Sequence, residues 1–140
     1  MQRSDALAQL SRDHHHGLVA AQRLSRATEA TLADARQAFL RFWEDEGRQH
    51  FHEEEDVLLP AFARHVAPAD EAIVRVLTEH VDLRRRAADL DAGSLEDAHE
   101  LGRRLHDHIR HEERVLFPMV EASFGDDELS DLGEALAQAH

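Results

Sequence analysis

Two short segments of the chain repeat one arrangement of histidine and glutamate. The first reads "HFHEEEDVLLP" over residues 50–60, and the second reads "HIRHEERVLFP" over residues 108–118. In each segment a glutamate follows a histidine by four residues, and side chains four apart meet on one face of a helix. The pairs are His50 with Glu54 and His108 with Glu112. Imidazole and carboxylate groups are ligands that iron, manganese and zinc accept, so both segments are candidate parts of a metal site.

Two further histidines, His14 and His80, stand alone on apolar stripes elsewhere in the chain. Apolar residues recur there at three- and four-residue steps, the period of an amphipathic helix, as they do around the repeated segments. The four stripes cover residues 7–24, 39–61, 73–90 and 101–119, and each is apolar except near its middle. A bundle with these stripes facing inward gathers four imidazoles and two carboxylates in one layer. The candidate metal ligands are His14, His50, Glu54, His80, His108 and Glu112.

Glutamates on core stripes favour a metal site over an ordinary polar core. A buried charge without a partner costs several kcal/mol, so Glu54 and Glu112 need a cation close by. On any one helix, the pattern could be a hydrogen-bonded core histidine or a histidine–glutamate pair at the surface. For this ordinary interpretation to hold, all four helices would have to show such a pattern by chance. A helix with one histidine, followed by a helix with the repeated pair, occurs twice in the chain. We therefore expect two metal ions that share bridging carboxylates, with iron or manganese favoured by the ligand types and zinc also compatible.

The ligand on the first helix has two candidates, because His14 and His15 are adjacent. The apolar stripe passes through position 14, which favours His14 and leaves His15 as the alternative. Glu55 and Glu113 follow the paired glutamates directly and are rotated away from the stripes, so we expect both in solvent. Three more histidines lie off the stripes and are expected beside the site or at the surface: His52, His106 and His111.

The composition predicts an all-α fold. The chain is rich in alanine, leucine, glutamate and arginine, which favour helices. Short connections between four helices of similar length predict an antiparallel up-down four-helix bundle over about residues 5–122. A short fifth amphipathic helix is expected over about residues 126–139. We expect residues 1–140 to form a single domain, because this length is enough for one hydrophobic core.

Turn and cap residues indicate where the predicted helices end. The expected boundaries are residues 31–34, the region of Pro68, and the pair Gly93 and Ser94, a helix stop followed by a cap. Pro60 and Pro118 each remove one backbone donor. We therefore expect the helix to kink or loosen just beyond each acidic cluster.

Charge and composition exclude several classes of protein. The chain has 29 acidic and 16 basic residues and a formal charge of −13, which argues against nucleic acid and anionic membranes as partners. It contains no cysteine, so disulfides and thiolate metal sites are excluded. The first residues lack the apolar run of a secretory signal, and no stretch approaches the ~20 apolar residues of a membrane span. We therefore expect a cytoplasmic protein.

The repeated pairs and the isolated histidines together resemble a known family. "HxxxE" occurs twice, each time followed by "EExxLxP", and the isolated histidines stand in "RDHHHGL" and "LTEHVDL". This pattern is similar to the hemerythrin-like HHE cation-binding domain over roughly residues 5–122. The resemblance implies a four-helix bundle and a non-heme diiron centre, bridged by an oxide or hydroxide, with the six candidate ligands named above.

The resemblance favours the diverse bacterial branch of the family over its dedicated oxygen carriers. Those carriers place a second histidine one turn along the third helix, where this chain has Val76 and Arg84 on either side of His80. If each iron takes about six ligands, two coordination positions stay open here. Open positions favour reaction with dioxygen, peroxide or nitric oxide over reversible carriage. We expect a role in sensing, storage or detoxification; the alternatives are an iron-handling protein that oxidises and holds iron, or a structural bundle with another metal such as zinc.

Overall fold

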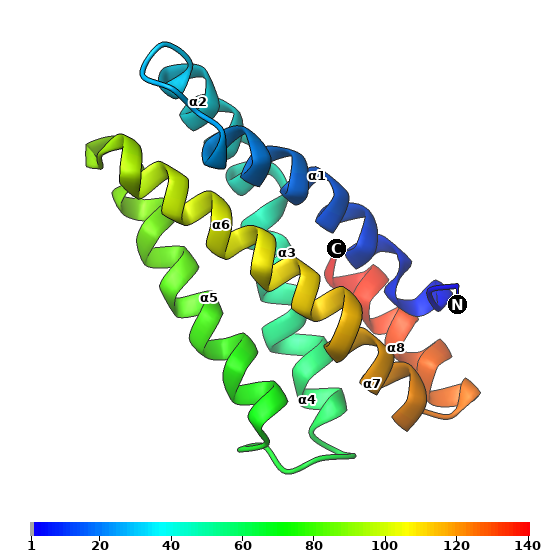
Figure 1. Ribbon diagram of the computed structural model, residues 1–140. Coiled ribbons are helices and arrows are strands. Elements are labelled where there is room, and N and C mark those ends of the chain that lie inside the picture. The colour runs from blue at the N-terminus through cyan, green and yellow to red at the C-terminus, as the bar shows by residue number, and fades with distance from the viewer. Residues whose placement is uncertain (1) are drawn as a thin grey trace.

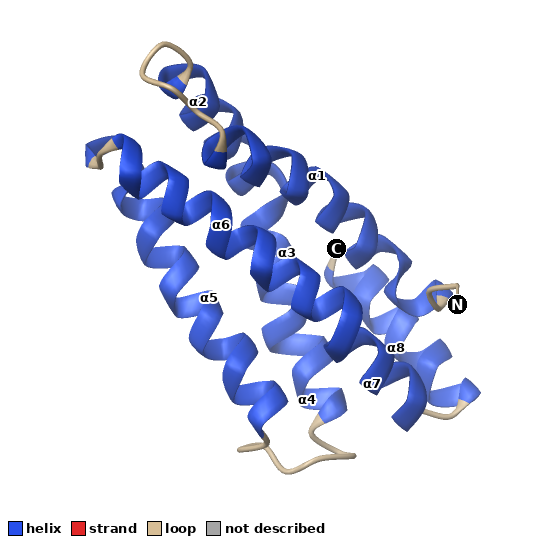
Figure 2. Ribbon diagram, viewed as in Figure 1, coloured by secondary structure: helices blue, strands red, loops and turns tan. Residues whose placement is uncertain are grey.

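The computed structural model describes residues 2–140, and these residues form helices joined by short loops, with no strand among them (Figure 2). The predicted all-helical fold is therefore confirmed. The helices are α1 (Ala8–Ser25), α2 (Leu32–Phe42), α3 (Arg48–Glu53), α4 (Leu59–Phe62), α5 (Glu71–Asp89), α6 (Leu95–His111), α7 (Phe117–Ser123) and α8 (Asp126–Ala139). Short 3-10 turns cover Asp5–Leu7 and Leu90–Ala92. No helix within residues 2–140 combines the length and the apolar character that crossing a membrane requires.

Four long helical arms make up the bundle: α1, α2 to α4, α5, and α6 to α7 (Figure 1). In the second and fourth arms, π-helical turns join the α-helical pieces, so the chain continues in one direction from α2 to α4 and from α6 to α7. Helix α8 packs beside the N-terminal segment (Figure 1), and its last residues reach α3, where the Gln49 amide donates to the Ala139 carbonyl at 2.6 Å. The chain therefore closes one end of the bundle with a separate helix.

Helices α1 and α6 approach each other closely because a glycine lies at each end of their contact. A Cβ atom on Gly102 would lie 2.6 Å from the carbonyl oxygen of Ala21, and one on Gly17 would lie 2.9 Å from Ile109. These contacts place residue 17 beside residue 109 and residue 21 beside residue 102, so α1 and α6 run in opposite directions. The up-down order of the other arms stays a prediction from the short connections.

The expected cap residues lie at the ends of α5 and α6. The Asp70 carboxylate accepts from the backbone N–H of Ala72 at 2.9 Å and begins α5 just after Pro68. Gly93 follows α5, and Ser94 and Asp97 form a reciprocal capping box at the start of α6. The first connection runs from Arg26 to Thr31, earlier than the expected break at 31–34.

The two prolines loosen their helices at a different place from the one expected. The π-helical turns Glu54–Leu58 and Glu112–Leu116 come before Pro60 and Pro118, not after the acidic clusters. A proline ring clashes with the carbonyl of the residue four positions earlier, so the preceding turn must widen. The widened turns therefore begin at the glutamates of the repeated pairs.

The apolar core has two parts, one toward each end of the bundle. One part includes Leu24, Phe39, Leu83 and Leu105, and the other includes Leu10, Leu58, Val76 and Leu116. The helices pass from one part to the other at His14, His50, His80 and His108, which are 1–4% exposed. The predicted polar layer therefore lies between two apolar layers that keep water away from it.

Candidate metal site

Six buried side chains from four helical arms converge in the polar layer. His14, His50, Glu54 and Glu112 form one group, and Glu54, His80, His108 and Glu112 form a second. In each group the nearest nitrogen and oxygen atoms all lie within 4.8 Å of one another, and both glutamates are 0% exposed. The two groups share Glu54 and Glu112, so the structure contains two adjacent half-sites with two carboxylates in common.

Each histidine turns its Nε2 atom toward a shared glutamate. The distances are 2.8 Å from His14 to Glu112, 3.1 Å from His50 to Glu54, 3.0 Å from His80 to Glu54, and 3.3 Å from His108 to Glu112. Four nitrogens and four carboxylate oxygens therefore face one small volume.

Four of these atoms lack a hydrogen-bond partner within residues 2–140 despite their short separations: Glu54 Oε1, His80 Nε2, His108 Nε2 and Glu112 Oε2. These four atoms belong to the second half-site, where nitrogen and oxygen are close but do not meet with hydrogen-bond geometry. In the first half-site, by contrast, His14 Nε2 pairs with Glu112 and His50 Nε2 pairs with Glu54. A buried polar atom without a partner is costly and uncommon in folded proteins. Lone pairs that converge without bonding to each other are the arrangement that a metal cation satisfies, so the donor set fits a metal.

The Nδ1 atom of each histidine contacts a further carboxylate outside the cluster. His50 contacts Asp13 at 3.0 Å, His80 contacts Glu55 at 2.6 Å, His108 contacts Glu79 at 2.7 Å, and His14 contacts Glu113 at 2.6 Å. When Nδ1 donates its proton to a carboxylate, the lone pair of Nε2 is free to bind a metal, and the ring orientation is fixed. All four imidazoles are therefore held with the same nitrogen facing inward.

The expectation that Glu55 and Glu113 lie in solvent is wrong. Their side chains are 22% and 27% exposed, and each binds the outer nitrogen of a histidine from another arm. The physical reason is the width of the imidazole ring, which brings Nδ1 to the edge of the core while Nε2 lies inside it. A carboxylate on the flank of the neighbouring helix is placed to accept from that edge.

Sequence reasoning also missed Asp13 and Glu79. Each stands directly before an isolated histidine, in the dipeptides Asp13–His14 and Glu79–His80. A side chain next to a ligand on a helix points about 100° away from it, toward the neighbouring arm, where it meets the histidine of the repeated pair. This adjacency, present in both halves of the chain, was the available signal.

Aromatic rings and arginines support the two isolated histidines. The Phe51 ring stacks on His80 with centroids 3.8 Å apart, and Phe117 stacks on His14 at 5.3 Å. Arg84 donates to Glu55 at 2.6 Å, and its guanidinium lies over Phe51. The His80 imidazole is therefore held on its face by Phe51 and at its Nδ1 edge by Glu55.

The charges around the site favour the ionised form of the carboxylates. Burial alone would raise the pKa of Glu55, but hydrogen bonds from His80 and Arg84 outweigh it and lower the pKa to about 2. Burial would likewise lower the pKa of His108, yet the carboxylates of Glu112 and Glu79 raise it to about 10. Six carboxylates surround four imidazoles in the layer, so the site carries surplus negative charge that two cations would neutralise.

Other candidate histidines lie outside the cluster. His15 is exposed, whereas its rival His14 lies inside the first half-site. His52 and His106 are exposed as well. His111 is half-buried, and its Nε2 atom has no hydrogen-bond partner within residues 2–140.

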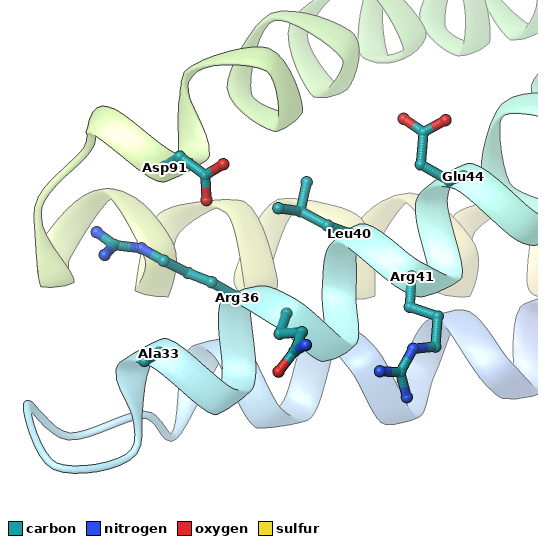
Figure 3. A pocket seen from close by; sticks show the side chains of 7 residues that line it. Ala33, Arg36, Leu40, Arg41, Glu44 and Asp91 are labelled. Atoms are coloured by element: carbon teal, nitrogen blue, oxygen red, sulfur yellow. The ribbon is translucent and has the colours of Figure 1, made fainter.

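A surface cavity of about 640 Å³ lies at the far end of the bundle, between α2 and the turn after α5 (Figure 3). It is lined by Ala33, Arg36, Gln37, Leu40, Arg41, Glu44 and Asp91. None of the six clustered residues lines this cavity. The candidate metal ligands therefore lie in the packed interior, apart from this cavity.

One comparison with known proteins gives a match. The family model of the hemerythrin HHE cation-binding domain matches residues 5–120, which include all six clustered side chains. No curated protein and no solved structure matches the chain.

Proposed function

Because the chain belongs to the hemerythrin HHE cation-binding domain family, we propose that its buried layer holds two iron ions and reacts with dioxygen or a related small oxidant. His14 and His50 would bind one ion, and His80 and His108 the other. Glu54 and Glu112 would bridge the two. Two-metal centres in proteins have spacings of ~3.5–4 Å, which suits carboxylates shared between adjacent half-sites.

The observation that carries this proposal is the set of converging atoms without partners. Both glutamates present an oxygen that has no hydrogen-bond partner within residues 2–140, and both oxygens face the second half-site. Glu54 Oε1 lies 3.0 Å from His80 Nε2, and Glu112 Oε2 lies 3.3 Å from His108 Nε2. Nitrogen and oxygen ligands without sulfur suit iron or manganese and are also accepted by zinc. Iron at this position would supply redox chemistry toward dioxygen, peroxide or nitric oxide.

The chain's own residues contribute orientation and exclusion of water. We call the carboxylates that contact the Nδ1 atoms the outer carboxylates: Asp13, Glu55, Glu79 and Glu113. They keep each Nε2 lone pair directed inward, and the apolar layers on both sides exclude water from the site. Only a small molecule could reach a site with side chains this buried. This favours a diatomic or peroxide ligand over a larger substrate.

The surroundings of His80 support reactivity over reversible carriage. One turn away in each direction stand Val76, which is fully buried in the apolar core, and Arg84, which is held by Glu55. Neither side chain can supply a fifth imidazole. The open coordination positions that follow are consistent with sensing, storage or detoxification of an oxidant.

The test is the metal content per chain together with the optical spectrum of protein purified in air. We expect about two irons per chain and an oxo-to-iron charge-transfer band. Glu112→Gln should lose the band, whereas Glu100→Gln, a surface carboxylate of the same α6–α7 arm that is 33% exposed, should retain it as the matched control. One zinc per chain, or no metal after loading with ferrous iron, would contradict the diiron proposal.

A further inference from the structure

Helix α5 carries an exposed apolar face on the outside of the bundle. Val74, Leu77 and Val81 are 47%, 41% and 69% exposed, and they follow one another at steps of three and four residues. We refer to these three side chains as the α5 apolar face. Val81 is the most exposed large hydrophobic residue within residues 2–140. Exposed apolar residues in line on one helix are typical of surfaces that bind another protein.

The spacing matches the contact line between two packed helices. Positions 74, 77 and 81 continue to position 84 in one direction and to position 70 in the other, by the same alternation of three and four. This is the repeat that brings apolar side chains of paired helices together. The α5 apolar face therefore fits a partner helix better than it fits a flat surface.

The charges along α5 identify the partner. Asp70 and Glu71 lie at its start, and Arg84 and Arg85 lie near its end. Glu71 forms no ion pair within residues 2–140, and Arg85 is bound only by carboxylates of its own helix, Asp82 and Asp89. Arg75 and Asp89 interrupt a strict division of charge along α5, but the acidic pair at its start and the arginines near its end are complementary to those of an antiparallel copy of the helix.

We propose that the α5 apolar face binds the same face of a second copy of the chain, with the two α5 helices antiparallel. Val74 then lies opposite the partner's Val81, and Val81 opposite the partner's Val74. The same alignment brings Glu71 close to the partner's Arg85. Each contact occurs twice, as an interface with two-fold symmetry requires.

The apolar area of three side chains is smaller than the ~800 Å² per partner of a standard stable interface. The dimer is therefore weak, with a dissociation constant on the order of 10–100 µM. Sedimentation of the intact, metal-loaded protein from about 5 to 500 µM should show the change from monomer to dimer. A single monomeric species over this whole range would overturn the proposal.

Val81→Glu tests the apolar contact. It places two like charges in the interface, so the variant should stay monomeric at the highest concentration. Val19→Glu is the matched control, because Val19 is 50% exposed but lies on α1. It should dimerise like the unchanged protein. Loss of the dimer in the control, or a dimer that survives Val81→Glu, would contradict the α5 interface.

The charge pairs give a second test that leaves the apolar face intact. Glu71→Arg and Arg85→Glu should each weaken the dimer roughly tenfold, because each brings like charges together twice. The double variant E71R/R85E restores opposite charges and should recover most of the affinity. A double variant as weak as the single variants, with normal circular dichroism, would overturn the antiparallel arrangement.

Discussion

The two half-sites are built from the same parts but have different surroundings. Each contains an acidic residue directly before a histidine, and each of these acidic residues holds the histidine of a repeated pair. In the first half-site that carboxylate is Asp13, which is 5% exposed and receives a further hydrogen bond from Gln9. In the second it is Glu79, which is 28% exposed and paired with Arg75 at the surface.

The aromatic ring beside the isolated histidine packs more tightly in the second half-site than in the first. Phe51 lies against His80 at 3.8 Å with the rings nearly parallel, whereas Phe117 is 5.3 Å from His14. The second half-site thus has the tighter ring packing, and the first has the more deeply buried carboxylate. We therefore expect the two similar sets of candidate ligands, which come from a repeated sequence pattern, to differ in metal affinity.

The largest effect is expected where the half-sites are joined. Glu112→Gln should remove binding of both ions, because this carboxylate belongs to both groups, whereas His80→Ala should affect only the second. The loss of affinity in Glu112→Gln should exceed the ~10–100-fold cost typical of an outer partner. Iron content per chain, measured after equilibration with ferrous iron, should fall toward zero in the first variant and to about half in the second. Equal iron contents in the two variants would argue against shared carboxylates.

Iron should leave the two half-sites at different rates. A chelator should extract iron in two phases, with the ion beside the more exposed Glu79 leaving first. Ligands that bind only the folded state stabilise it by about 2.7 kcal/mol at a hundredfold excess over their dissociation constant. The melting temperature should therefore drop by roughly 5–15 °C on full extraction. The release of iron can be monitored by optical absorption. If it occurred in a single phase, the two half-sites would behave alike.

Much of the fold and of the cluster could be read from spacing alone, because helical periodicity fixes which side chains share a face. The apolar stripe through position 14 favoured His14 over His15 as the candidate ligand. Of these two histidines, only His14 is among the six clustered residues in the structure. The same rule misplaced Glu55 and Glu113, because it describes one helix at a time. Whether a flanking carboxylate meets a ring nitrogen depends on the distance between two helices and on the rotation of the ring. Neither quantity is encoded in the spacing of residues on one helix.

Asp13 and Glu79 allow a direct comparison of how much an outer carboxylate contributes to metal affinity in each half-site. Asp13→Asn should lower the affinity of the first half-site more than Glu79→Gln lowers that of the second, because a buried carboxylate is less screened by water. We expect losses toward the upper and lower ends of the ~10–100-fold range, respectively. Calorimetric titration with ferrous iron under anaerobic conditions would resolve the two affinities. Equal losses in the two variants would mean that the depth of burial does not decide how strongly an outer carboxylate acts.

The smallest effect is expected at the arginines that hold Glu55 and Glu113. Arg84 contacts Glu55 at 2.6 Å, whereas the corresponding distance from Arg3 to Glu113 is 3.4 Å. Both ion pairs are partly exposed, so each is worth about 1 kcal/mol or less. Arg84→Gln should therefore weaken iron binding at the second half-site only a few-fold.

Arg3→Gln should leave iron binding nearly unchanged and act on stability instead. Arg3 donates to the Glu113 carbonyl at 2.7 Å and to the Glu121 carboxylate at 2.6 Å, which ties the N-terminal segment to the α6–α7 arm. The comparison needs two readouts for each variant, iron affinity and melting temperature. If Arg3→Gln weakened iron binding as much as Arg84→Gln does, the 3.4 Å contact would be enough to hold Glu113 against His14, and the two half-sites would be more alike in their supports than the distances indicate.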